Sequence, residues 1–78
     1  MKRVSVMLEF EIDGHKAVGF KIDDSDVIWL PKSQIFNLEA LLDAEPTYKE
    51  KVSVEIPEWL AIKKGLDPYC EEVEDEVH

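Results

Sequence analysis

The first 22 residues alternate between apolar and polar side chains, and this pattern constrains the fold more than any other feature of the chain. The apolar positions of the first run are Val4, Val6, Leu8, Phe10 and Ile12. A period of two places these side chains on one face of a strand. Asp13-Gly14 follows, a pair that readily takes the positive φ of a tight turn, and a second alternating run carries Val18, Phe20 and Ile22. The pattern predicts a β-hairpin with one buried face.

The register of this hairpin depends on the length of its loop. A two-residue loop of Asp13-Gly14 would place Leu8 opposite Gly19, so that the second apolar row would lack a partner. If His15 joins the loop, or a bulge adds one residue nearby, the two apolar rows face each other. The cross-strand pairs are then Phe10 with Val18, Leu8 with Phe20, and Val6 with Ile22. We expect this second register because it buries both rows together.

Two more apolar runs predict strands. Residues 27–30 form a short continuous run that ends at Pro31, and residues 52–56 alternate again. Together with the hairpin they predict an α+β fold with one or two short helices. The sheet is expected to be small, bent and antiparallel, with three to five strands, or to form a partly open barrel. Three aromatic residues at strand positions are assigned to its core: Phe10, Phe20 and Trp29.

Two segments predict the helices. Residues 37–43 have apolar positions at helical spacing, and Asn37 is expected to cap this helix. The second helix is expected to begin at Pro57, where a missing N–H costs nothing, and to end at Gly65, which takes the left-handed conformation of a C-cap. Its core-facing residues are expected to be Trp59, Leu60 and Ile62.

The length and the charge bound the domain organisation. The chain has 78 residues, enough for one hydrophobic core, and we expect a single globular domain over residues 1–70. Residues 71–78 carry five carboxylates and only two valines, so they are expected to form a solvated acidic tail that folding does not need. An acidic contact surface is the alternative interpretation of this tail.

The composition also bears on location and partners. No apolar run is long enough to cross a bilayer, the N-terminal segment is interrupted by Glu9 and Glu11, and Cys70 is the single cysteine. These features predict a cytoplasmic protein. The net charge of −9 disfavours direct binding to a nucleic acid, because such binding depends on cationic side chains.

The sequence offers no convincing catalytic set, and we predict that the protein is not an enzyme and needs no cofactor. The two histidines lie in a turn, His15, and at the end of the chain, His78, where burial is not expected. Cys70 is followed by Glu71 and Glu72, whose charges disfavour a reactive thiolate.

The spacing of the acidic residues does not match that of a calcium-binding loop. The acidic run from Asp23 to Asp26 resembles the first ligands of such a loop, but the loop also needs a glycine at its sixth position and a glutamate at its twelfth. Counted from Asp24, these positions hold Trp29 and Ile35. We therefore predict no metal site.

Two segments carry a resemblance to known proteins. The sequence WLPKSQ lies within residues 27–35, and PEWLA followed by KKG lies within residues 52–66, together about 24 of the 78 residues. In these segments the chain resembles a group of short phage and prophage proteins without an assigned activity. By size and acidity it is also similar to the anti-CRISPR inhibitors that phages encode. The resemblance implies a mobile-element origin and, in an infected cell, the host cytoplasm.

These observations lead to three hypotheses about function, of which the last is a structural or assembly module whose acidity serves solubility alone. The first is a non-enzymatic acidic protein that binds the basic surface of a nucleic-acid-binding host complex and mimics DNA, as an anti-CRISPR inhibitor would. The second is a phage accessory protein in which a small barrel binds single-stranded nucleic acid through aromatic stacking and a few lysines. For the first, the partner-binding candidates are the densest carboxylates: Asp23, Asp24, Asp26, Glu71, Glu72, Glu74, Asp75 and Glu76.

Overall fold

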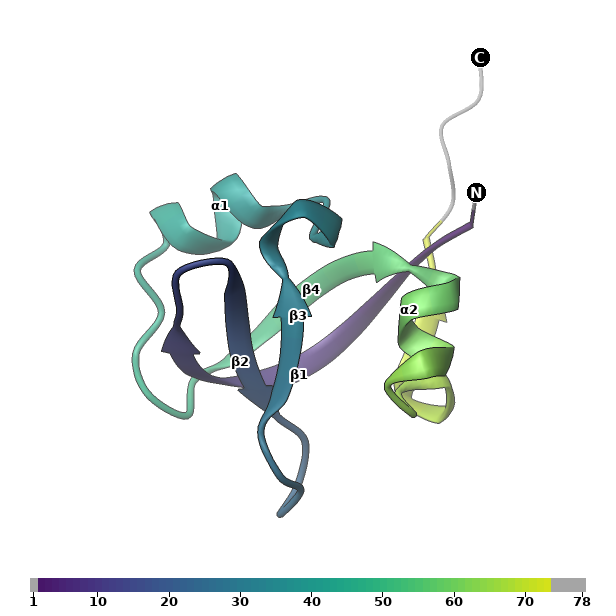
Figure 1. Ribbon diagram of the computed structural model, residues 1–78, viewed down its shortest axis with the longest axis horizontal. Helices are drawn as coiled ribbons and strands as arrows, with labels where there is room; N and C mark the ends of the chain where they lie inside the picture. The colour runs from purple at the N-terminus through teal and green to yellow at the C-terminus, as the bar shows by residue number, and fades with distance from the viewer. Residues whose placement is uncertain (1, 74–78) are drawn as a thin grey trace.

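A computed structural model describes residues 2–73 of the chain as a five-stranded antiparallel sheet with two short α-helices (Figure 1). The strand order is β3-β2-β1-β4, and β5 pairs with β1. The elements in chain order are β1 (Arg3–Asp13), β2 (Ala17–Lys21), β3 (Ile28–Pro31), η1 (Lys32–Gln34), α1 (Leu38–Asp43), β4 (Lys51–Pro57), α2 (Glu58–Lys63), η2 (Asp67–Tyr69) and β5 (Cys70–Glu72). The predicted α+β fold is confirmed.

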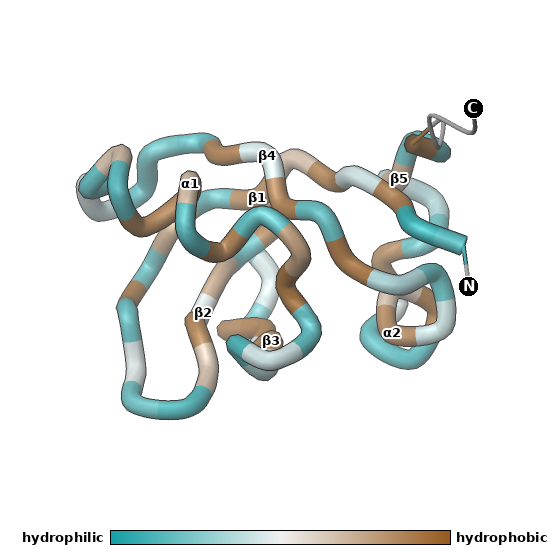
Figure 2. Tube along the Cα trace, turned by 90° about the horizontal axis from the view of Figure 1, so that it is seen from above, coloured by the Kyte–Doolittle hydropathy of each residue, from teal (hydrophilic) through white to brown (hydrophobic). Residues whose placement is uncertain are grey.

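The sheet is strongly bent but remains open within residues 2–73. β3 lies across from β4, with the hydrophobic core between them, and α1 and α2 lie at different ends of the molecule (Figures 1 and 2). Along β1 and β4 buried residues alternate with more exposed ones, which places one face of each of these strands in the core. Each α-helix is six residues long, and no helix in the described part of the chain is long and apolar enough to cross a membrane.

The predicted cross-strand pairs of the hairpin are wrong, although its buried face is correct. Phe10 lies opposite Phe20 rather than Val18, and a bulge shifts the register between Phe10 and Ile12. The rings of Phe10 and Phe20 meet edge to face with their centroids 6.3 Å apart. At Phe10 the register differs from the expected one by two residues, and an even shift keeps the apolar residues from Val4 to Phe10 on the buried face. Beyond the bulge Ile12 is exposed, so its predicted place in the buried row is wrong. The alternation therefore predicts the buried face without fixing the register.

Trp29 was assigned to the core, and this prediction is wrong. Its side chain is 45% exposed, whereas its neighbour Leu30 is fully buried. Residues 27–30 are all apolar, so their sequence does not distinguish the inner face of the strand from the outer one. The structure places Leu30 inward, which turns Trp29 outward, opposite Gly19 of β2.

The side chain of Asn37 pairs with a strand instead of capping α1. Its amide Nδ2 donates a hydrogen bond to the Ser53 carbonyl (2.8 Å), and its Oδ1 accepts one from the Glu55 N–H (3.0 Å). The Phe36 N–H donates to the Glu55 carbonyl (2.8 Å). Because these groups belong to the outer edge of β4, the Phe36-Asn37 segment covers this edge much as a short strand would.

Helix α2 follows its predicted boundaries but turns a different face to the core. Pro57 is the N-cap rather than the first helical residue, and Gly65 has the expected positive φ of 73°. Leu60 is buried as predicted, together with Ala61, whereas Trp59 and Ile62 are exposed. The prediction that Trp59 and Ile62 face the core is therefore wrong. A helix of six residues has room for few inward positions, and Leu60 and Ala61 occupy them.

Truncating Trp59 should have little effect on stability. Because the side chain is 49% exposed, we expect the Trp59→Ala variant to lose less than about 1 kcal/mol of unfolding free energy in a denaturant titration. The matched control on the same helix is Leu60→Ala, which removes a side chain that is 2% exposed and should cost about 2 to 5 kcal/mol. Equal losses in the two variants would contradict this description of α2.

Candidate functional site

Strands β2 and β5 pair with the same edge of β1 and leave a gap between them at Met7. β2 pairs with β1 from Glu9 onward, and β5 pairs with residues 4–6. Even-numbered residues of β1 bond to the β4 side, as the Phe10 N–H does to the Glu50 carbonyl (2.8 Å), so Met7 turns its backbone groups to the other edge. In the described residues neither β2 nor β5 has a residue in register with Met7.

This gap opens into a shallow groove of about 270 Å³, which we call the Met7 groove. Its lining residues are Met7, Leu8, Glu9, Lys21, Ile22, Asp23, Lys51 and Tyr69. Met7 and Tyr69 are half exposed there, which puts apolar and aromatic surface between charged side chains. Glu9 is opposite Lys21 on one side and Lys51 on the other, so charges of both signs line the groove.

The Asp23–Asp26 turn connects β2 to β3 and has a defined conformation. Asp23 has a φ of 51°, in the left-handed region that aspartate tolerates better than most residues. Ser25 closes the turn: its Oγ accepts a hydrogen bond from the Ile22 N–H (3.1 Å), and its own N–H donates to the Ile22 carbonyl (3.0 Å). The turn therefore holds its carboxylates on an ordered backbone.

The three carboxylates of this turn are exposed and make no ion pair with any residue between 2 and 73. Only Asp23 lines the Met7 groove, whereas Asp24 and Asp26 lie outside it. The three do not form a metal-binding cluster, and no group of three or more potential ligands occurs in the described residues.

The acidic C-terminal segment begins inside the sheet. The solvated tail that the sequence predicts from residue 71 begins inside β5: the side chains of Glu71 and Glu72 are exposed, but their backbone belongs to this strand. Glu71 lies opposite Ser5, and the Glu72 carboxylate lies 3.5 Å from Lys2 Nζ. Backbone pairing with the long strand β1 explains why this segment is ordered in spite of its charge. Three other candidates, Glu74, Asp75 and Glu76, lie outside the described residues.

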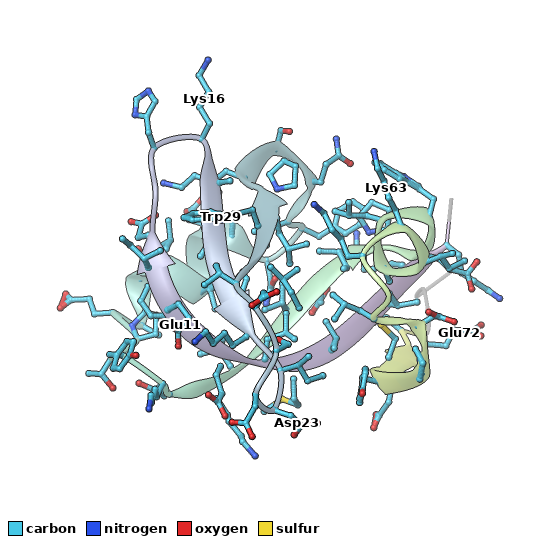
Figure 3. All side chains as sticks on the ribbon, turned by 60° about the horizontal axis from the view of Figure 1, so that its bottom comes forward. Glu11, Lys16, Asp23, Trp29, Lys63 and Glu72 are labelled. Carbon is cyan, nitrogen blue, oxygen red and sulfur yellow. The ribbon has the colours of Figure 1, made fainter. Side chains whose placement is uncertain are left out.

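The structure brings part of the predicted site together. Asp23 and Tyr69 line the same groove, and β5 begins directly after Tyr69, so the acidic turn and the first residues of β5 flank the Met7 gap. Glu71 is two positions from the gap along β1, through its partner Ser5. Figure 3 shows that Asp23 and Glu72 do not touch each other. The site is therefore an acidic edge interrupted by a groove.

Sequence reasoning missed the apolar part of this surface. Met7 is an apolar residue at a position where alternation requires a polar one, and this exception was the available signal for an exposed contact residue. Tyr69 and Trp29 gave no comparable signal, because nothing in their local sequence distinguishes a core aromatic from an exposed one.

Cys70 is not placed for nucleophilic chemistry. Burial, and then the nearby charge of Asp67, raise the pKa of its thiol. The Sγ donates a hydrogen bond to the Leu66 carbonyl at 3.2 Å. A thiol with a raised pKa and an engaged proton gives little thiolate at neutral pH.

The comparisons with known proteins identify no relative. No family model matches the chain, and no curated protein and no solved structure shows significant similarity to it.

Proposed function

We propose that this chain is a non-enzymatic protein-binding module of phage or mobile-element origin. Its carboxylates bind the basic, nucleic-acid-binding surface of a host complex and compete there with DNA or RNA. The observation that carries the proposal is the Asp23–Asp26 turn, whose three exposed carboxylates have an ordered backbone and no internal counter-ion among residues 2–73.

Order in the turn matters because it lowers the cost of binding. A disordered acidic segment must lose conformational entropy when it meets its partner, whereas charges held on a folded turn lose less. Carboxylates without internal partners also attract a basic surface over a distance and so accelerate association. The half-exposed Met7 and Tyr69 supply adjacent apolar contact area, which a purely electrostatic surface would lack.

A specific observation supports the second candidate function. Trp29 lies exposed on the outer face of the sheet, where its indole offers a surface for stacking a nucleotide base. Binding of labelled single-stranded DNA at about 50 and 200 mM salt separates the two functions. A nucleic-acid-binding protein would bind and would weaken steeply with salt, whereas a mimic would not bind at either concentration.

The carboxylates of the turn should control association with the partner. We expect the triple variant Asp23→Asn, Asp24→Asn, Asp26→Asn to fold normally and to associate roughly tenfold more slowly, with a weaker dependence on salt. The measurement is competition, in which the chain displaces fluorescent target DNA from a CRISPR effector complex, the first target to test.

The matched control for this variant changes the net charge equally at another place. Glu39→Gln, Asp43→Asn, Glu45→Gln removes three exposed carboxylates in and after α1, and we expect it to retain most of the activity. If the turn variant and the control variant compete equally well across a salt series, the turn is not the binding site. If the unmodified chain displaces no DNA, this complex is not its target.

A further inference from the structure

Strand β3 is an edge strand whose outer backbone groups have no partner within residues 2–73. The Lys32 N–H donates to the Lys16 carbonyl (2.9 Å), which shows that even-numbered residues of this strand bond to β2. Trp29 therefore turns its N–H and C=O away from the sheet. An edge residue with both groups outward can exchange two hydrogen bonds with an added antiparallel strand.

The side chains beside this edge form an apolar surface, which we call the Trp29 patch: Ile12, Val27 and Trp29. All three are exposed, and they surround Gly19 on the outer face. A Cβ added at Gly19 would lie 3.0 Å from Ile12 Cγ2 and from Val27 Cγ1, and 3.3 Å from Trp29 Cζ3. The glycine therefore lets the three side chains converge over β2 into one continuous patch rather than three scattered residues.

The two ends of β3 carry opposite charges. The Asp23–Asp26 turn precedes the strand, and the hairpin tip with Lys16 lies beside its other end, next to Lys32 (Figure 3). Lys32 is already engaged by Asp13, 2.8 Å from its Nζ, whereas Lys16 is exposed and makes no ion pair within residues 2–73. A strand that runs antiparallel to β3 and carries the same charges would meet opposite charge at both ends.

We infer that β3 pairs with β3 of a second copy of this chain, so that the Trp29 patches of the two copies join about a two-fold axis at Trp29. Each Trp29 N–H then donates to the C=O of the partner's Trp29. In this register Val27 lies opposite the partner's Pro31, and Asp26 lies opposite the partner's Lys32. The acidic turn of each copy approaches the cationic end of the other, and the two indoles become neighbours.

The covered edge of β4 and the residues of β3 itself favour an assembly that closes at two copies. The outer edge of β4 is already covered by Phe36 and Asn37. Pro31 has no N–H to donate, which limits the pairing to the middle of β3. A two-fold pairing consumes the edge of both copies, so the sheet does not extend further.

The contact is small, and the chain is acidic, so the dimer should be weak. We expect a dissociation constant on the order of 10 to 100 µM, as for small transient interfaces. Repulsion between two copies with a net charge of −9 each opposes association, and salt near 0.15 M reduces it by shortening the screening length to about 8 Å. Association is measured by sedimentation velocity from about 5 to 500 µM.

If the two-fold axis passes beside residue 29, Trp29 of one copy contacts Trp29 of the other. Substitutions at this one residue therefore test the proposed pairing. We expect Trp29→Glu and Trp29→Lys each to weaken self-association at least tenfold, since each variant sets like charges opposite each other. An equimolar mixture of the two variants should associate again as a heterodimer. The matched control is Trp59→Glu, a similarly exposed tryptophan on α2, which should dimerise like the unmodified chain.

The outcomes are distinct. If the unmodified chain stays monomeric up to about 500 µM, the inference is wrong. It is also wrong if the Trp29→Glu variant dimerises as strongly as the unmodified chain. A mixture that fails to associate, with both variants folded by circular dichroism, rejects the axis at Trp29. If the variants do not fold, amide hydrogen exchange of the unmodified chain decides, because dimerisation must protect the Trp29 N–H at high concentration only. The test uses no host complex, so it stands apart from the proposed function.

Discussion

Replacing Phe20 with alanine should unfold a large fraction of the protein. Phe20 of β2 is fully buried and packs edge to face on Phe10. Truncation of a buried phenylalanine typically costs about 3 to 5 kcal/mol, because the transfer free energy is lost and a cavity remains. A domain of this length has a total stability of roughly 4 to 12 kcal/mol. A urea titration followed by circular dichroism measures the loss.

Phe36→Ala is the matched control for this experiment, because it makes the same chemical change at an exposed position. Phe36 is 43% exposed, and its ring lies under the Arg3 guanidinium, 4.3 Å from the ring centroid. An exposed cation–π contact contributes about 0.5 to 1 kcal/mol, so the control should lose no more than about that. Similar losses at Phe20 and Phe36 would mean that the core is not centred on the β1–β2 hairpin.

Ending the chain after Cys70 should destabilise the protein, which reverses the expectation from the sequence. The truncation removes Glu71 and Glu72 from the edge of β1, together with the hydrogen bond from the Val73 N–H to the Arg3 carbonyl (3.1 Å). These contacts are worth about 1 to 2 kcal/mol in total. For a domain of this size the melting temperature should fall by about 8 °C in a calorimetric scan.

A chain that ends after Val73 is the control, because it keeps β5 and removes only residues 74–78. The difference in melting temperature between the two truncated chains then isolates the pairing of β5 with β1. If both chains melt at the same temperature, residues 71–73 contribute nothing to the fold, and the acidic segment would be dispensable from residue 71 as the sequence indicates.

The sequence determined four of the five strands, both α-helices and most of their boundaries, but not β5. Alternation along residues 4–12 and 52–56 set the strands, and Pro31, Pro57 and Gly65 marked where elements end. These signals are local: a period of two or a missing N–H acts on its own segment whatever the rest of the chain does. For the same reason the buried face of residues 4–10 was correct even though the register was not, whereas Ile12, beyond the bulge, is exposed.

The candidate site was predicted less completely, because its residues depend on distant segments. The sequence located the acidic turn, but not the groove that Asp23 shares with Tyr69, which arises at Met7, between the parts of β1 that pair with β2 and with β5. The sequence also indicated a helix cap at Asn37. In the structure the side-chain amide of Asn37 bonds to Ser53 and Glu55, which are 16 and 18 residues away in the chain. Such pairings follow from the bend of the whole sheet and leave no local pattern.

The two tryptophans show most clearly what only the tertiary structure decided. Their size and apolar character predicted burial, and both are about half exposed. The core of a small domain has few inward positions, and Leu30 and Leu60 already fill those beside Trp29 and Trp59. Which of two adjacent apolar residues turns inward depends on how the opposite strand and helix pack against them. The packing of the whole core therefore decides the orientation, and the sequence around either residue does not.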